Sequence, residues 1–179
     1  MLYRFDGRQP IVGRGTYVSE TASVIGDVRI GSDCYVGHGV ILRGDYGTII
    51  IGDGTAVEEG VIVHAPPHDR CTIGNRVTVG HGAIIHAKSI GDFVTIGMGA
   101  ILSIRCEVGG GSIIAEGAIV KRGQKTPESS VMAGNPARKV REMKQEDSDY
   151  WNMAKELYIN LAHKYLEEGM EPVAMEPLS

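Results

Sequence analysis

An aliphatic residue returns every six positions along most of the chain, and this period is the feature that most constrains the fold. An α-helix repeats every 3.6 residues and a simple strand every two, so neither produces the pattern. Short strands joined by tight corners do produce it, as in a parallel β-helix built from hexapeptide repeats. The series is Val18, Val24, Ile30, Val36, Leu42, Ile51, Val57, Val63, Ile73, Val79, Ile85, Ile90, Ile96, Leu102, Val108, Ile114 and Val120.

A small or β-branched residue lies four positions after most of these aliphatics, and glycine often follows them directly. We expect both repeated positions to point into the core, with glycine supplying the backbone dihedrals of the corners. Cys34 and Cys106 occupy small inward positions, which indicates core packing. Cys71 lies where the period is interrupted, and the pattern does not place it. An odd total of three cysteines argues against a disulfide framework.

The period divides the chain into five segments. Residues 1–16 lead into a β-helix at 17–122, residues 123–146 form a loop and transition, 147–169 form a helix, and 170–179 form a tail. The fold class is therefore an all-β solenoid with a C-terminal α-helix.

The C-terminal helix is predicted from its termini and from one apolar face. Ser148 or Asp149 could cap its start, and Gly169 and Pro172 end it. We expect it to pack along the β-helix or on a neighbouring subunit. Its apolar face consists of Ala154, Leu157, Tyr158, Leu161 and Tyr165.

Composition excludes several classes of protein. The 18 basic and 22 acidic residues give a net charge of −4, without the basic excess of a nucleic-acid-binding protein. No apolar run approaches the roughly 20 residues of a membrane-spanning helix. The first ten residues carry three charges and no apolar stretch typical of a secretion signal. We therefore expect a cytoplasmic protein that binds neither nucleic acid nor membrane.

Two of the six histidines fall in one outward column of the repeat. His64 follows Val63 and His86 follows Ile85, so the two occupy the same slot on neighbouring coils. Neighbouring coils lie about 4.8 Å apart. Two nitrogens on one tetrahedral zinc lie about 3.3 Å apart at Zn–N distances of roughly 2.0–2.1 Å. Small tilts of the rings would close this difference.

His81 lies two residues after Val79, on another strand of the coil, and therefore points from a different face. A site that contains all three histidines needs a second chain, and cyclic repetition gives a trimer most simply. On this pattern alone, a pair of stacked surface histidines without function is an equal alternative. Arg43 occupies the His64 column, Asp45 follows two positions later, and Glu59 occupies the His81 column.

The segments around these histidines resemble the gamma-class carbonic anhydrases and their close homologues, which are left-handed β-helices. Residues 132–141 also resemble the stretch that ends the β-helix in this family. The remaining resemblance is carried by Leu42-Arg43-Gly44-Asp45, Glu58-Glu59-Gly60, His64, Val79-Gly80-His81 and His86.

The resemblance implies that His64, His81 and His86 bind a metal between the subunits of a homotrimer, with His81 donated by the neighbouring chain. It implies that Arg43 pairs with carboxylates across the interface and helps to hold bicarbonate, with Asp45 and Glu59 as its partners. The implied reaction is the reversible hydration of CO2 to bicarbonate, a lyase activity. Zn2+ is the expected metal, and Fe2+ or Co2+ are alternatives because imidazole suits all three.

Two departures from the family pattern bear on activity. Glu58 stands where the family usually has a glutamine that hydrogen-bonds the metal-bound solvent, so it adds a negative charge there or works as a base. The acidic loop with a proton-shuttling glutamate is absent, because His64 and His81 are only 17 positions apart and Tyr46 follows Asp45. His68 could move protons instead, with a solvated loop histidine as the alternative.

Two other functions remain open from the sequence. One is a metal-binding homologue with little or no anhydrase activity. The other is a hexapeptide acyltransferase that uses an acyl-CoA, which only the fold supports.

Overall fold

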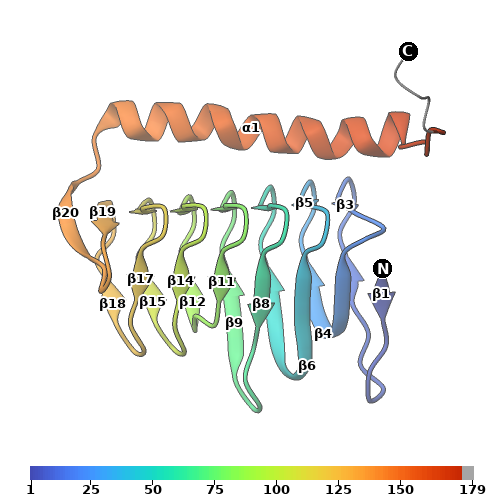
Figure 1. Ribbon diagram of the computed structural model, residues 1–179, viewed down its shortest axis with the longest axis horizontal. Helices are drawn as coiled ribbons and strands as arrows, with labels where there is room; N and C mark the ends of the chain where they lie inside the picture. The colour runs from blue at the N-terminus through green and yellow to red at the C-terminus, as the bar shows by residue number, and fades with distance from the viewer. Residues whose placement is uncertain (175–179) are drawn as a thin grey trace.

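A computed structural model describes residues 1–174, and residues 175–179 of the expected tail lie outside the described residues. The chain forms a parallel β-helix of about 7 turns with one long helix along its side (Figure 1). The β-helix and the C-terminal helix expected from the sequence are therefore confirmed.

The elements are short strands followed by one helix. In chain order they are β1 (Leu2–Tyr3), β2 (Ile11–Val12), β3 (Tyr17–Val18), β4 (Ser23–Ile30), β5 (Tyr35–Val36), β6 (Ile41–Ile51), β7 (Ala56–Val57), β8 (Ile62–His64), β9 (Arg70–Ile73), β10 (Thr78–Val79), β11 (Ile84–Ile85), β12 (Ser89–Ile90), β13 (Thr95–Ile96), β14 (Ile101–Leu102), β15 (Glu107–Val108), β16 (Ile113–Ile114), β17 (Ile119–Val120), β18 (Lys125–Thr126), β19 (Ser130–Ala133), β20 (Arg138–Glu142) and α1 (Gln145–Glu168).

Successive coils pair in parallel, and the register follows the six-residue period. Val63 pairs with Ile85, which pairs in turn with Leu102. One sheet runs in the order β20-β19-β16-β13-β10-β7-β5-β3, while the other walls belong to a second sheet in which β6 lies between β8 and β9. β20 is the exception, because it pairs antiparallel with β19.

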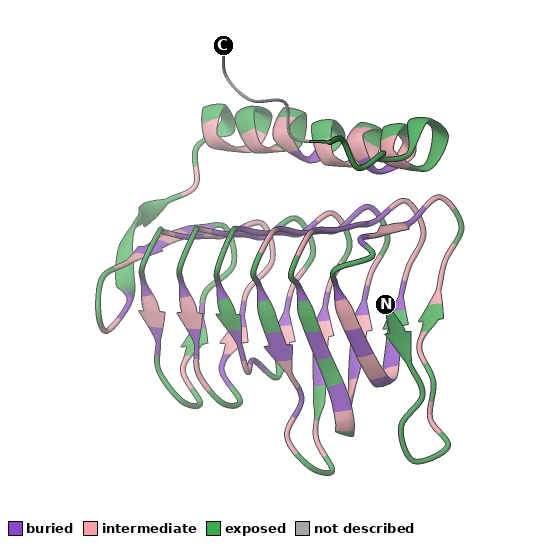
Figure 2. Ribbon diagram, turned by 45° about the vertical axis from the view of Figure 1, so that its right-hand side comes forward, coloured by how far each residue is buried: buried purple, intermediate pink, exposed green. Residues whose placement is uncertain are grey.

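The main core is an apolar column inside the coils, and a smaller cluster lies under α1. Every member of the aliphatic series from Val24 to Val120 is buried. Figure 2 shows how these buried positions recur from coil to coil along the walls. Cys34, Cys71 and Cys106 are all free and buried. Burial raises the pKa of the Cys71 thiol to about 12, so this residue acts as core filling in the interruption of the repeat.

The corners need glycine because neighbouring coils approach closely. A Cβ atom on Gly109 would lie 2.5 Å from the backbone nitrogen of Glu128 on the next coil. Such a distance is well inside van der Waals contact, so a side chain there would push the coils apart.

The β-helix extends further than the segment 17–122 expected from the period. At the start, β1 and β2 both pair in parallel with β4. At the end, β18 and β19 continue the two sheets. The first coil lacks the six-residue spacing because a turn at Asp6 and Gly7, both with positive φ, inserts residues between β1 and β2.

Helix α1 lies along the β3–β5–β7 wall of its own chain (Figure 1). It begins at Gln145, two residues before the expected start. The residue that satisfies its first turn is Asp147, which accepts a hydrogen bond from the Lys144 backbone at 2.9 Å. The caps expected at Ser148 and Asp149 are therefore wrong, because Lys144 holds the N-cap position and both residues lie inside the helix.

The expected apolar face of α1 is confirmed at Ala154, Tyr158, Leu161 and Tyr165, which are partly buried, and is wrong at Leu157, which is 65% exposed. Lys155 and Ala162 are buried on the same side of the helix. Tyr158, Leu161 and Tyr165 pack against the cluster that contains Ala162. No helix in residues 1–174 has the length and apolarity to span a membrane.

Candidate metal centre

His64 and His86 lie side by side on neighbouring coils, as the repeat predicts. His64 ends β8 and His86 directly follows β11, and these two strands pair in parallel. The ring centroids are 5.0 Å apart, with the rings edge to face at 75°. The spacing comes directly from the spacing of the coils.

The surroundings of this pair favour neutral imidazoles. Burial lowers the pKa of both rings, and the positive charge of Arg43 lowers both further. The Nδ1 atom of His64 is buried and has no hydrogen-bond partner. A neutral imidazole is the form that binds a metal ion, and an orphaned buried nitrogen needs an explanation. The pair therefore fits two ligands of a metal that takes further ligands from elsewhere.

Arg43 and Asp45 lie beside the histidine pair on β6. Arg43 is the register partner of His64, and its Nη1 donates to Asp45 Oδ2 at 2.7 Å. Asp45 Oδ1 lies 3.8 Å from His64 Nε2. Burial raises the pKa of Asp45, but hydrogen bonds from Arg43 and the Tyr46 backbone outweigh it and keep this pKa below its ordinary value. Asp45 is therefore an ionised carboxylate beside His64, bonded to Arg43 and too far from the imidazole for a hydrogen bond.

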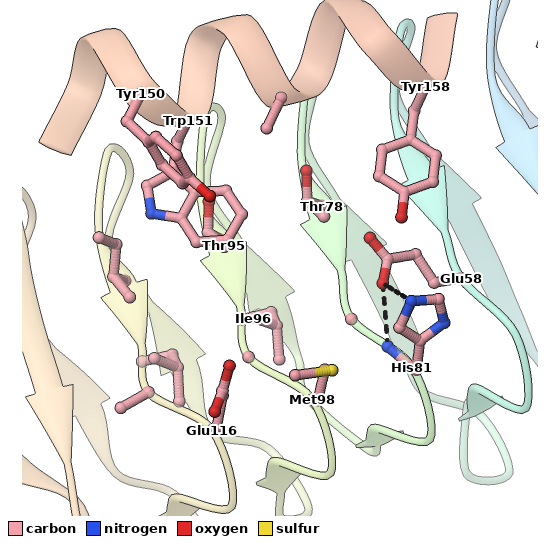
Figure 3. Close-up of a pocket in the computed structure, with 16 residues that line it drawn as sticks. Glu58, Thr78, His81, Thr95, Ile96, Met98, Glu116, Tyr150, Trp151 and Tyr158 are labelled. Carbon is pink, nitrogen blue, oxygen red and sulfur yellow. Dashed lines mark hydrogen bonds and ion pairs between the residues drawn. The ribbon is translucent and has the colours of Figure 1, made fainter. Parts of the chain in front are cut away.

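His81 lies at a separate corner, between two carboxylates. Its Nε2 lies 3.1 Å from Glu58 Oε2, and its Nδ1 lies 2.9 Å from Glu59 Oε2. The same Glu58 oxygen accepts a hydrogen bond from the His81 backbone (Figure 3). Glu59 also accepts a bond from the Tyr35 hydroxyl at 2.6 Å, which helps to hold the pKa of Glu59 low against the effect of burial.

The candidate ligands are thus divided between two places in one chain. Within residues 1–174, no group of three His, Cys, Asp or Glu side chains is arranged to hold a metal ion. His64 and His86 form one candidate half-site on the β8–β11 wall, and His81 with its two acids forms the other candidate half-site. A three-histidine centre requires two chains, which is the arrangement that the repeat frame predicts.

His68 lies exposed in the loop between β8 and β9, with a positive φ of 60°. Its backbone N–H donates to the Tyr46 carbonyl at 3.4 Å. The remaining histidines, His38 and His163, each bond one side chain that lies beside them in the fold. His38 bonds Ser19 at 2.7 Å, and His163 bonds Asp33 at 2.7 Å.

The sequence did not identify the polar contacts that two residues of α1 make with the β-helix. The Tyr158 hydroxyl bonds the Glu58 carboxylate, and this bond adds to burial in raising the pKa of Tyr158. Lys155 is buried against β13 and bonds Thr95. Residues 151, 155, 158, 162 and 165 recur at steps of three and four, which predicts one inward stripe on the helix. The lysine at 155 hides this pattern, because a charged residue is typical of an exposed face.

The known proteins that are similar to this chain carry names of different functions. No protein-family model matches the chain. It is 35% identical over 168 residues to gamma carbonic anhydrase 2, mitochondrial, of Arabidopsis thaliana, covering 90% of this chain and 60% of that protein. It is 33% identical over 149 residues to carnitine operon protein CaiE of Escherichia coli, covering 83% and 76%. It is also 34% identical over 172 residues to gamma carbonic anhydrase 1, mitochondrial, of the same plant, and it spans 60–62% of the length of these two plant relatives.

Two solved structures match nearly the whole chain. A hexapeptide transferase family protein from Anaplasma phagocytophilum is 33% identical with a TM-score of 0.87, covering 92% of this chain and 97% of that one. A putative acetyltransferase of Bacillus cereus is 28% identical with a TM-score of 0.91, covering 93% and 97%.

Proposed function

Because the chain belongs to the gamma carbonic anhydrase-like family, we propose that it hydrates CO2 reversibly to bicarbonate at a metal shared between copies in a homotrimer. His64 and His86 of one chain and His81 of the next are the proposed ligands. The observation that carries the proposal is that the three histidine ligands lie at two separate places in one chain. His64 and His86 lie 5.0 Å apart on one wall, while His81 is held at another corner.

An apolar stripe beside the histidine pair supports self-association. Ile41, Ile62 and Ile84 are in register on successive coils and are 37–38% exposed. Ile101 continues the stripe on β14. Exposed apolar side chains aligned in one column are typical of a surface that another protein covers.

The charges of the two half-sites are complementary. Arg43 lies beside His64, and Arg122 shares a surface hollow with His86. Glu58 and Glu59 flank His81, and Glu116 lies in the same column two coils further on. Contact between a basic half-site and an acidic half-site joins two different surfaces, and such head-to-tail contacts form a trimeric ring when each chain is rotated by one third of a turn from the last.

The side chains then divide the work of the reaction. Zn2+, Fe2+ or Co2+ suits an imidazole set, and when bound it would supply Lewis acidity that lowers the pKa of water toward about 7. Glu59 orients His81 from its Nδ1 side, and Asp45 places a negative charge 3.8 Å from His64 Nε2. The proposed role of Glu58 is to accept a hydrogen bond from the reacting water beside His81. The Arg43 guanidinium, half-exposed at the same wall, attracts bicarbonate.

Metal content of single variants tests the shared site. We expect about one metal per chain in the wild type and near-complete loss in both His64→Ala and His81→Ala. His38→Ala is the matched control, because His38 bonds Ser19 and should leave the metal in place. Elemental analysis of the purified proteins provides the measurement. Full metal in His81→Ala would contradict a site that His81 completes.

The CO2 reaction needs a separate measurement. Stopped-flow hydration by the metal-loaded protein should exceed the buffer rate and fall to it in His64→Ala. A metal-loaded wild type that is no faster than buffer would retain the metal centre and contradict the anhydrase activity, leaving a metal-binding homologue.

An acyltransferase is the second candidate, and the names of the two solved relatives favour it. That function predicts coenzyme A binding. We expect no thermal stabilisation of the protein by coenzyme A or acetyl-CoA. A saturable increase in melting temperature would favour the transferase instead.

A further inference from the structure

Tyr35 on β5 places a buried hydroxyl group beside one of the two acids that flank His81. The residue is 3% exposed, and its hydroxyl donates to Glu59 Oε1 at 2.6 Å. The other oxygen of the same carboxylate, Oε2, lies 2.9 Å from His81 Nδ1. The Glu59 carboxylate is therefore held through both of its oxygens, by Tyr35 on one side and by His81 on the other.

The hydroxyl of Tyr35 stays protonated and so remains a donor. Burial raises the pKa of Tyr35, and the bond to Glu59 raises it further. Burial alone would raise the pKa of Glu59 as well, but hydrogen bonds, led by the one from Tyr35, keep it below its ordinary value. The contact therefore joins a neutral donor to an ionised acceptor, which is a strong kind of hydrogen bond.

Three neighbouring aromatic rings fix the direction of the Tyr35 side chain. Its ring stacks on Tyr17 with centroids 5.7 Å apart, and Tyr158 and Tyr165 of α1 lie 5.5 and 6.1 Å away. A ring locked by such packing presents its hydroxyl to Glu59 in one direction. Helix α1 is thus connected to His81 through two side chains, Tyr35 and Glu59.

Gly37, two residues after Tyr35, leaves the space that the Glu59 carboxylate occupies. A Cβ atom on Gly37 would lie 2.6 Å from Glu59 Oε1 and 3.0 Å from its Cδ. The backbone of Gly37 lies outside the left-handed region that favours glycine, so the close approach of Glu59 is the reason for glycine here. Tyr35 and Gly37 together form a cradle for this carboxylate.

His81 needs one ring nitrogen for the proposed metal and the other for its orientation. A ligating histidine usually donates its second ring N–H to a carboxylate or a carbonyl, which fixes the direction of the ring. Glu59 takes that place at Nδ1, which leaves Nε2, on the Glu58 side of the ring, for a metal. Because the His81 side chain is 47% exposed, packing alone does not hold it, and its direction depends on the carboxylates.

We propose that Tyr35 is a positioning residue of the shared metal centre. Its hydroxyl fixes the Glu59 carboxylate, and Glu59 fixes the His81 ring that one chain offers to the next. The role is indirect, since Tyr35 touches Glu59 and none of the proposed ligands. The inference rests on the proposed function, because it concerns the same centre.

Removal of the Tyr35 hydroxyl tests these contacts in metal-free protein. Tyr35→Phe keeps the ring and its packing. With histidine labelled by the heavy nitrogen isotope, we expect this variant to shift the His81 ring-nitrogen resonances, which are assigned by their loss in His81→Ala. Tyr165→Phe is the matched control, because it removes a hydroxyl from the same aromatic cluster and keeps the Tyr35–Glu59 bond. Unshifted His81 resonances in Tyr35→Phe would overturn the proposal.

Affinity for Zn2+, measured by competition with a chelator, gives a second readout. Tyr35→Phe should weaken binding about three- to tenfold, at or below the lower end of the effect that direct partners of ligating histidines have. Gly37→Ala should weaken it as well, because the added Cβ displaces the same carboxylate. Tyr165→Phe should bind like the wild type. Unchanged affinity in both Tyr35→Phe and Gly37→Ala would overturn the positioning role.

The wild type separates this inference from the proposed function. A wild type that binds no metal would overturn the shared centre, and this inference with it. A wild type that binds about one Zn2+ per chain, with the same affinity in Tyr35→Phe and Gly37→Ala, would overturn this inference alone.

Discussion

Lys155 carries an amine into the apolar layer between α1 and the β-helix. Burial lowers its pKa from 10.5 to about 8, and the neighbouring Arg76 charge adds to the shift. The unfolded chain therefore binds more protons than the folded chain between about pH 8 and 10.5. Over that window, this residue makes the free energy of unfolding rise with pH.

Replacement of Lys155 by methionine should stabilise the protein. We expect Lys155→Met to raise the free energy of unfolding at pH 7 by about 1–3 kcal/mol, because a buried charge is removed while the volume is kept. The gain should shrink as pH rises through the window of about 8 to 10.5. Denaturant titrations of both proteins across this range measure the difference. A gain that does not change with pH would contradict the buried-charge explanation.

At the scale of the element, α1 is held to the β-helix by an aromatic cluster. Tyr165 stacks on Tyr17 with ring centroids 4.5 Å apart, and Tyr158 lies 5.5 Å from Tyr35. These contacts join the last turns of α1 to β3 and β5 at the opposite end of the chain. Stacked pairs contribute beyond their buried area.

Truncation of this cluster should loosen the helix. We expect Tyr165→Ala to lower the free energy of unfolding by about 2–3 kcal/mol, because it removes the stack on Tyr17. Leu157→Ala, on the 65% exposed face of the same helix, should cost less than about 1 kcal/mol. Thermal unfolding of the two variants makes the comparison. Equal losses would contradict the orientation of α1, in which Tyr165 faces the β-helix and Leu157 faces away from it.

The corners of the coils allow a similar comparison between adjacent glycines. A Cβ on Gly109 would lie 2.5 Å from the Glu128 backbone, whereas one on Gly110 would lie 3.3 Å from the Asp92 carbonyl. Gly109→Ala should therefore cost more than about 2 kcal/mol and Gly110→Ala less than about 1 kcal/mol. Denaturant midpoints of the two variants test this order, and the reverse order would contradict the close approach of the coils.

The six-residue period predicts the coils that keep its spacing, and it does not predict the first coil or the packing of α1. It places Val63, Ile85 and Leu102 in one stack, and hence His64 beside His86, because parallel register fixes both. It misses the first coil, where the turn at Asp6 and Gly7 breaks the spacing. On α1 it misses the burial of Lys155 and the exposure of Leu157, because both depend on how the helix packs against the β-helix.

At the scale of the whole molecule, the proposed function belongs to an assembly. Each chain carries a histidine pair with basic neighbours on one wall and one histidine between acids at another corner. The sequence could anticipate this division, since the repeat assigns each histidine to a face. It could not supply the Tyr158 bond to Glu58, which comes from a helix far along the chain.

The measurement that tests the shared centre most directly is metal content after co-expression of two defective chains. Each proposed site needs His64 from one chain and His81 from the next, so His64→Ala and His81→Ala should each bind almost no metal alone. In randomly mixed trimers, about one quarter of the sites combine an intact half from each variant, since each half is intact with probability one half. We predict metal at about one quarter of the wild-type level in the mixture. Metal no higher in the mixture than in the separate variants would contradict a centre shared between chains.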